Sequence, residues 1–303
     1  MKQTFFAALC LLSPLFILSA QDTSLHDNLV EGQGWQEAVT GYSFTDGLAS
    51  DAKGNLLFTD VKTGKGIYQL ALDGKVSLLI DNQPGISGLA LGADGRIYAC
   101  QNKAGKVVVF EKDGTVKELI IDVKPNDLIV TKKGFVYFTE TPTRRIHCIT
   151  PEGKAFVADE GHVIRPNGIT LSADQTALAV SEHGGRNVWT WQIQNDGKLT
   201  GAEPYMTMQV SPNNAKGESL GDGATTDEKG RYYVTTELGI QVFDAMGRHS
   251  GTIAPPFLGA KIVSTEFAGE NHDWLFVCAG ERIFKRKTNT RGAWLASTPA
   301  PKP

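Results

Sequence analysis

A short apolar segment recurs six times along this chain of 303 residues. The intervals between the last residues of successive copies are 41, 39, 42, 55 and 42 residues. A period near forty residues, with several strands in each unit, is typical of a β-propeller. The six copies are Gly54–Asp60, Gly95–Gln101, Gly134–Glu140, Thr176–Glu182, Gly230–Glu237 and Asp273–Ala279.

Each unit repeats an order of four short strands separated by turns, and the long interval contains an insertion from Pro204 to Gly221. Glycine in hairpin turns such as Leu72–Gly74 and Asn195–Gly197 supplies the positive φ that twisted strands require. The sequence therefore predicts an all-β fold, a six-bladed β-propeller over residues 35–290, with an open sandwich as the alternative. In the first unit the expected strands are Leu48–Ser50, Leu56–Thr59, Ile67–Ala71 and Val76–Ile80.

The sixth unit has a third strand at Arg282–Lys287 but no convincing fourth strand. Residues Glu37–Thr40, before the first unit, can supply it. We therefore expect an N-terminal strand to close the ring, which removes the exposed edges that open sheets must protect.

The two ends of the chain are expected to lie outside the propeller. Residues 1–20 contain Lys2, an apolar stretch and the small-residue end Leu18-Ser19-Ala20, the pattern of a secretory signal peptide cleaved near Ala20. The mature protein is then secreted or periplasmic, with a linker at 21–34 and a tail at 291–303. No later stretch approaches the length of a membrane span.

The charge balance limits the classes of binding partner to be expected. Thirty basic and 33 acidic residues give a net charge of −3 with no basic tract, so nucleic acid is not an expected partner. A small molecule is expected instead, and no obligate protein partner is implied. Three cysteines remain after the leader, Cys100, Cys148 and Cys278, and we expect all three to be thiols.

Aligning the six units places a polar residue at one equivalent position, fourteen or fifteen residues before the end of each copy. In a propeller this position begins the innermost strand and faces the mouth of the central tunnel. The side chains at this position supply oxygen ligands, which favour Ca²⁺ or Mg²⁺. A wet tunnel without a ligand is the alternative, because Asp and Asn also favour turns. The residues are Asp46, Ser87, Asn126, Asn167, Asp222 and Thr265, and the predicted metal ligands are Asp46, Asn126, Asn167 and Asp222.

Around these positions the sequence resembles the senescence marker protein (regucalcin), gluconolactonase and luciferin-regenerating enzyme family of six-bladed propellers. The likeness runs from about Thr45 to Lys287. It is carried by Lys124-Pro-Asn-Asp-Leu128 with Val136-Tyr-Phe-Thr139, by Arg165-Pro-Asn-Gly-Ile169, and by Asp222-Gly223 leading into Gly230 and Val242-Phe-Asp244.

The resemblance implies one divalent cation, usually calcium, at which lactones are hydrolysed; Mg²⁺, Mn²⁺ or Zn²⁺ could replace it. Asn126, Asn167 and Asp222 match the family's ligands. Asp46 stands where the family usually has a glutamate, which could shift the ion or lower its affinity. Lys124 stands where the family often has an arginine that contacts substrate.

Asp222 is the expected catalytic residue, as ligand and general base, with Glu140 in reserve. The expected substrate-binding residues are Lys124, Arg165, Glu140 and His183. Alternatives remain for two of them: Glu140 as a solvated strand end, and His183 as a surface histidine rather than a proton relay. Arg144, Arg145 and Arg186 could add a positive rim with Arg165, or pair with neighbouring carboxylates.

The function expected from this pattern is metal-dependent hydrolysis of a small lactone, most readily an aldonolactone, by a hydrolase of the gluconolactonase type. The sequence contains no His-Glu-x-x-His helix and no phosphate loop. The alternatives are a related metal-dependent phosphoesterase and a noncatalytic ligand-binding propeller, because propellers host many activities.

Overall fold

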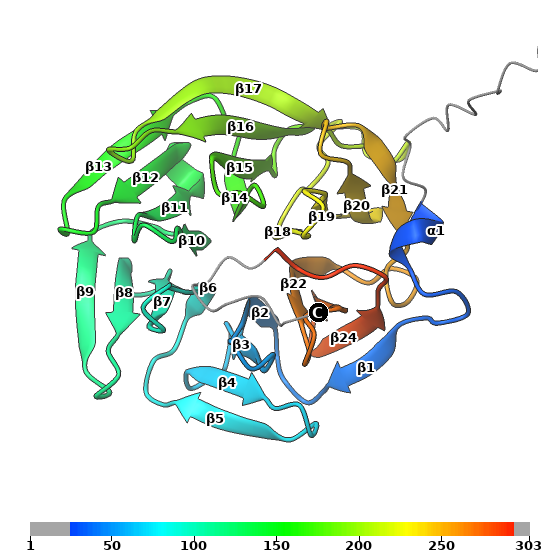
Figure 1. The fold of residues 1–303 in the computed structure, drawn as a ribbon, viewed down its shortest axis with the longest axis horizontal. Coiled ribbons are helices and arrows are strands. Elements are labelled where there is room, and N and C mark those ends of the chain that lie inside the picture. Colours follow the sequence, from blue (N-terminus) through cyan, green and yellow to red (C-terminus); the bar gives the residue numbers. More distant parts are fainter. Residues whose placement is uncertain (1–24, 294–303) are drawn as a thin grey trace, which may run out of the picture.

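Six four-stranded antiparallel sheets are arranged around a common central axis in the computed structural model, which describes residues 25–293 (Figure 1). Five sheets are each built from four consecutive strands, with the first at the centre and the fourth at the rim. The predicted six-bladed β-propeller is confirmed. Each predicted segment contributes the second strand of one blade.

The strands of the five consecutive blades are as follows. Blade 1 contains β2 (Thr45–Ser50), β3 (Leu56–Asp60), β4 (Ile67–Leu70) and β5 (Val76–Ile80), and blade 2 contains β6 (Ile86–Leu91), β7 (Ile97–Gln101), β8 (Lys106–Phe110) and β9 (Val116–Ile121). Blade 3 contains β10 (Leu128–Val130), β11 (Val136–Glu140), β12 (Arg145–Ile149) and β13 (Ala155–Glu160), with the short 3₁₀ helix η1 (Thr141–Thr143) between β11 and β12. Blade 4 contains β14 (Pro166–Leu171), β15 (Ala177–Glu182), β16 (Asn187–Ile193) and β17 (Leu199–Thr207), and blade 5 contains β18 (Ala224–Thr226), β19 (Tyr232–Thr236), β20 (Gly239–Phe243) and β21 (His249–Ile253).

The sixth blade joins the two ends of the chain. Its outermost strand is β1 (Gln36–Val39), which pairs antiparallel with β24, shown beside each other in blue and red in Figure 1. Val39, opposite Ile283, is 4% exposed, so closure also buries apolar surface. The predicted closure by the N-terminal strand is confirmed. The other three strands are β22 (Ile262–Ala268), β23 (Trp274–Ala279) and β24 (Arg282–Lys287).

The core consists of apolar layers between neighbouring blades. Every residue of β3, β11 and β19 is buried, because these second strands are covered by another blade on each face. Between blades 2 and 3, for example, Cys100 and Val107 share a cluster with Leu128 and Phe138. Burial on both faces explains why the repeated segments are almost continuously apolar rather than alternating.

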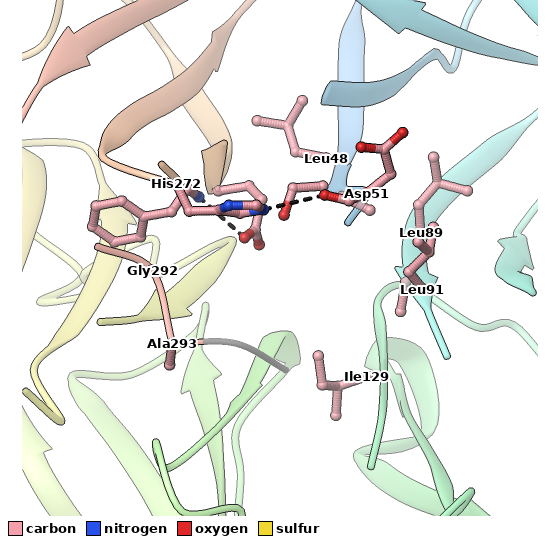
Figure 2. Close-up of a pocket in the computed structure, with 13 residues that line it drawn as sticks. Leu48, Asp51, Leu89, Leu91, Ile129, His272, Gly292 and Ala293 are labelled. Atoms are coloured by element: carbon pink, nitrogen blue, oxygen red, sulfur yellow. Dashed lines mark hydrogen bonds between the residues drawn. The ribbon is translucent and has the colours of Figure 1, made fainter. Parts of the chain in front are cut away.

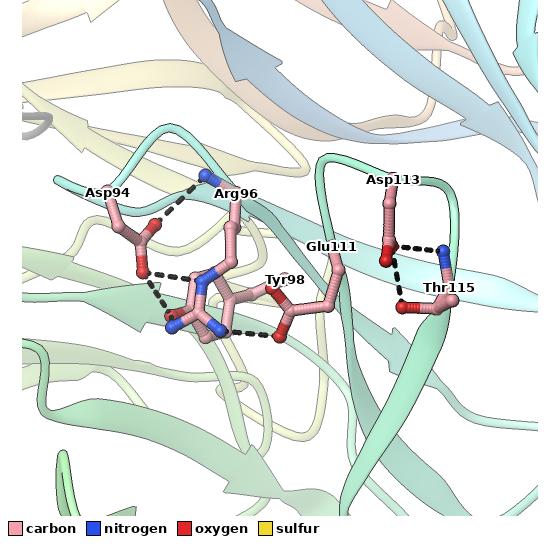
Figure 3. Close-up of polar contacts among 6 residues, drawn as sticks. All are labelled: Asp94, Arg96, Tyr98, Glu111, Asp113 and Thr115. Atoms are coloured by element: carbon pink, nitrogen blue, oxygen red, sulfur yellow. Dashed lines mark hydrogen bonds and ion pairs between the residues drawn. The ribbon is translucent and has the colours of Figure 1, made fainter.

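Aspartates organise the hairpin turns at the opposite end of the blades from the ring. The carboxylate of Asp94 accepts the backbone N–H of Arg96 at 2.9 Å, and Asp113 accepts that of Thr115 at 2.9 Å (Figure 3). In each turn the carboxylate takes the place of a backbone carbonyl as the acceptor for this N–H. Arg96 also pairs with Glu111 at 2.6 Å, which links the two turns of blade 2.

The predicted linker at 21–34 differs from the structure, because the chain is already docked from Leu25. Helix α1 (Leu25–Asn28) lies against β21, and the fully buried Asn28 accepts a hydrogen bond from the guanidinium of Arg231. At the other end, the backbone N–H of Ala293 donates to Thr226 O at 2.7 Å, so the predicted tail begins in contact with blade 5. The predicted signal peptide at 1–20 lies outside the described residues.

The structure also bears on the expected insertion and on the cysteines. Pro204, predicted to begin the insertion, lies inside β17, an outermost strand where a missing N–H faces no partner strand. The three cysteines among the described residues are buried thiols, as expected. Within residues 25–293, no helix has the length and apolar character needed to cross a membrane.

Candidate functional site

The predicted ring residues gather at one mouth of the tunnel. Asp46 lies in β2 and Asn167 in β14, whereas Asn126 and Asp222 stand two residues before β10 and β18. The carboxylates of Asp46 and Asp222 interact electrostatically, although they come from blades 1 and 5. The fold therefore brings together side chains that are far apart in the sequence.

Hydroxyl groups of the preceding blade hold three of the ring residues, Asn126, Asn167 and Asp222. Thr139 Oγ1 donates to Asn167 O at 2.7 Å, and Ser181 Oγ donates to Asp222 O at 2.6 Å. Ser87 Oγ, itself a ring residue, donates to Asn126 O at 2.7 Å. These bonds fix the main chain at each of these ring positions relative to the preceding blade, and so fix where the ring residues lie along the tunnel axis.

Two of the six ring positions carry hydroxyls that are hydrogen-bonded to the main chain. The hydroxyls of Ser87 and Thr265 donate to backbone carbonyls, the second at 2.8 Å to Phe276 O. The remaining four are the two aspartates and two asparagines that the sequence predicted as ligands.

The two ring carboxylates are half-buried. Burial raises the pKa of Asp46 to about 7, against a hydrogen bond from the N–H of Gly47 that lowers it. Burial, followed by repulsion from Asp46 and Asp127, raises the pKa of Asp222 well above its usual value. Both shifts would be relieved by a cation between the carboxylates.

Sequence reasoning missed a second acidic level directly below the ring. Asp127 and Glu266 each follow a ring position, in blades 3 and 6, and line a small cavity in the tunnel. Burial raises the pKa of each carboxyl to about 8. The sequence could have revealed these two acidic residues, because the equivalent position in the other four blades is a glycine: Gly47, Gly88, Gly168 and Gly223.

The donor chemistry of the ring fits a hard divalent cation. Two carboxylates and two amides supply only oxygen ligands, and Ca²⁺ accepts such a set with water completing its shell. Among residues 25–293, no three His, Cys, Asp or Glu side chains form a metal-type cluster, so half of the expected ligand set here depends on the amides of Asn126 and Asn167. The orientation of those amides consequently matters.

The acidic residues that end the second strands hold the segments leading to the ring. Glu140 accepts the backbone N–H of Lys124 at 2.8 Å, the hydroxyl of Thr143 at 2.6 Å, and contacts His147 Nε2 at 2.9 Å. Glu182 likewise accepts the N–H of Ile164 at 2.9 Å. Glu140 is 5% exposed, so its contacts position the approach to Asn126, whereas the sequence suggested a substrate contact or a reserve base.

Two cationic side chains stand at the same offset from the asparagines. Lys124 and Arg165 are exposed, and each precedes a Pro-Asn pair in neighbouring blades. Arg165 has a left-handed φ of 58°, and Pro166 follows it, a combination that local sterics disfavour. Of the other arginines considered, Arg144 donates to Gly161 O and Arg145 pairs with Glu160 at 2.9 Å.

His183 lies beside the ring rather than on the open surface. Its Nδ1 atom is 3.3 Å from Asn167 Nδ2 and 3.2 Å from Gly221 O. Burial, together with the charge of Arg165, lowers the pKa of His183, so the imidazole is neutral near pH 7.

The other end of the tunnel is lined largely by apolar side chains. Figure 2 shows a pocket lined by Leu48, Leu89, Leu91 and Ile129, with His272 at its side. His272 Nε2 lies 3.1 Å from Asp51 O. None of the four predicted metal ligands lines this pocket, so the chemistry expected from the sequence belongs to the opposite mouth.

The model of the SMP-30/Gluconolactonase/LRE-like region matches residues 44–281, which is most of the chain. This chain belongs to that family. The resemblance found in the sequence is therefore confirmed, and the match includes all four ring ligands.

Individual relatives agree with this assignment. The gluconolactonase of Zymomonas mobilis is 24% identical over 238 residues, covering 69% of this chain and 65% of that protein, a little under two thirds of its length. A gluconolactonase structure from Xanthomonas campestris has a TM-score of 0.75 and 22% identity, covering 87% of this chain and 92% of that one. The calcium-binding protein regucalcin from Agrobacterium tumefaciens has a TM-score of 0.71 and 16% identity, covering 87% and 97%. These likenesses show the propeller fold.

Proposed function

We propose that this protein hydrolyses a small lactone, most readily an aldonolactone, at a divalent cation held by Asp46, Asn126, Asn167 and Asp222. The observation that carries the proposal is the electrostatic repulsion between the half-buried carboxylates of Asp46 and Asp222, with Asn126 and Asn167 at the equivalent positions of blades 3 and 4. The family supports it, because the relatives named above include gluconolactonases. Calcium is the proposed ion, since regucalcin in the same fold is described as calcium-binding.

The cation, when bound, supplies positive charge that polarises the lactone carbonyl and lowers the pKa of water. Asp222 is the proposed general base and takes a proton from the attacking water. Water adds to the carbonyl carbon, the ring C–O bond breaks, and the proton passes to the departing alkoxide, giving a hydroxy acid.

Lys124 and Arg165 are the proposed substrate contacts. Their cationic side chains are exposed, each two residues before a ring asparagine, and can orient the hydroxyls of a sugar lactone. Glu140 acts through Lys124, whose backbone it fixes, and is a positioning residue in this proposal. We further propose that the reaction takes place outside the cytoplasm, as the predicted leader implies.

The test is hydrolysis of a panel of aldonolactones and aliphatic lactones by calcium-loaded and chelated protein, followed through acid release. Asp222→Asn keeps an oxygen donor but removes the base, so we expect calcium binding with a loss of kcat of about a hundredfold or more. Asp196→Asn, on an exposed hairpin turn, is the matched control and should retain full activity.

Full activity of Asp222→Asn would exclude Asp222 as the base. If the loaded wild-type protein hydrolyses no lactone, the proposal fails in favour of a phosphoesterase or a binding propeller. Phosphoester turnover and ligand binding at the same ring would then distinguish those two.

A further inference from the structure

The imidazole of His183 lies between the ring residue Asn167 and the main chain of Gly221. Its backbone N–H donates to Arg165 O at 3.1 Å, which ties it to the strand that carries Asn167. Its Nδ1 atom lies 3.3 Å from Asn167 Nδ2 and 3.2 Å from the carbonyl of Gly221, the residue before Asp222. A single nitrogen therefore faces a donor on one side and an acceptor on the other.

The two contacts make opposite demands on that nitrogen. An amide N–H₂ can only donate, so the contact with Asn167 requires Nδ1 to be an unprotonated acceptor. A carbonyl can only accept, so the contact with Gly221 requires Nδ1 to carry the proton. One neutral tautomer satisfies each contact, and neither satisfies both.

The choice of tautomer determines which end of the Asn167 amide faces His183. With the proton on Nε2, Nδ1 accepts from Asn167 Nδ2, and Oδ1 points away from the imidazole. With the proton on Nδ1, the amide N–H₂ meets another donor, and rotation of the amide relieves the clash by turning Oδ1 towards His183. Only the first arrangement leaves the oxygen available to a cation, because an amide N–H₂ has no lone pair to offer.

We propose that His183 is a positioning residue, which through its Nε2-protonated tautomer fixes the Asn167 amide with its oxygen free to bind a cation. The inference rests on the proposed cation site. It explains why the amide nitrogen of Asn167 lies on the His183 side in the structure. Groups that orient metal ligands in this way commonly change metal affinity by about ten- to a hundredfold.

The first experiment measures calcium binding by titration calorimetry on the full-length protein and its variants. His183→Phe keeps a ring of similar shape but removes the acceptor, and we expect calcium affinity to fall by about tenfold or more. His183→Asn can place an amide oxygen where Nδ1 stands, and we expect affinity within about threefold of wild type. His162→Phe, at an exposed histidine that contacts Asp159, is the matched control and should bind calcium like wild type.

The second experiment reads the tautomer directly and does not depend on any variant folding. Long-range ¹H–¹⁵N spectra of the calcium-loaded wild-type protein should show His183 protonated on Nε2. A proton on Nδ1 in that state, or equal calcium affinity of His183→Phe and wild type, would overturn the inference. Neither experiment contains a lactone, so they separate the role of His183 from the proposed reaction; absence of calcium binding by wild type would overturn both.

Discussion

The burial of Asp46 predicts that this ring carboxylate destabilises the cation-free protein. The folded-state pKa of Asp46 lies at about 7, against an ordinary value of 3.8, because burial disfavours the charged form. The folded state therefore holds a proton that the unfolded chain releases, and stability falls as pH rises from about 4 to about 7. At 1.4 kcal/mol per pKa unit, the full penalty above pH 7 is about 4 kcal/mol.

The perturbation that tests this is Asp46→Asn. Asparagine keeps an acceptor for the N–H of Gly47, which now donates to Asp46 Oδ1 at 2.9 Å, but carries no charge. Because Asp46 retains some access to water in the tunnel mouth, we expect a gain of about 2 to 4 kcal/mol at pH 8 without cation, or a melting temperature higher by about 5 to 10 °C. At pH 4 the difference between the two proteins should disappear.

Calcium should reverse the order of the two melting temperatures, so that the wild-type protein is more stable than Asp46→Asn. The cation stabilises the wild-type protein by binding its folded state, and the variant with one carboxylate fewer should gain less. The assay is thermal unfolding at pH 4 and pH 8, with chelator and with calcium. A melting temperature of chelated Asp46→Asn below that of wild type at pH 8 would refute the reasoning.

Asp60, at the end of β3 in the same blade, provides a control of opposite sign. Burial alone would raise its pKa, but hydrogen bonds from Ser43, Phe44 and Thr63 outweigh burial, and the pKa of Asp60 is lowered. Its carboxylate stabilises the fold above about pH 4, and this contribution is lost as pH falls through the lowered pKa. Asp60→Asn should therefore destabilise the protein at pH 8, where Asp46→Asn stabilises it.

Three further predictions concern the ring and the frame around it. Ser181→Ala removes the hydroxyl that donates to Asp222 O, so we expect a loss of about 1 kcal/mol in unfolding free energy and several-fold weaker calcium binding by calorimetry, whereas Thr115→Ala on an exposed turn should leave calcium binding unchanged. Deleting Glu37–Thr40 removes most of β1, and calorimetry should show a lower melting temperature with association through the freed edge of β24; an unchanged monomer would contradict this. Thiol titration without reductant should find Cys100, Cys148 and Cys278 unreactive in the native protein and all three reactive in denaturant, and a single reactive thiol would show that a disulfide exists.

Much of the frame could be predicted from the sequence because turns and strands carry separate local signals. The expected strand Arg282–Lys287 coincides with β24, and Val76–Ile80 coincides with β5. Both are bounded by turns, where backbone conformation depends on few residues. The missing fourth strand of blade 6 was equally informative, because the other five units each supply four strands and the segment before the first unit was left to complete the sixth.

The roles of polar side chains near the ring could not be predicted in the same way. A glutamate at the end of a strand has the same sequence context whether it faces solvent or turns back to the main chain. The buried contacts of Glu140 with Lys124 N and Thr143 depend on how blade 3 places a loop sixteen residues away. Pro204 shows the converse, since its place within β17 depends on that strand being outermost.

The glycines below the ring connect the backbone of this fold to its electrostatics. A Cβ atom on Gly168 would overlap the carbonyl oxygen of Asp222, and one on Gly223 would lie 2.6 Å from Val263 O. Glycine at these positions therefore allows the innermost strands to approach more closely than side chains would permit. Close approach narrows the tunnel, and a narrow tunnel keeps water from the carboxylates of Asp46 and Asp222 and holds them within range of each other. The same packing that closes the propeller thus creates an unfavourable charge pair, and that cost is the source of the affinity for a cation that we propose.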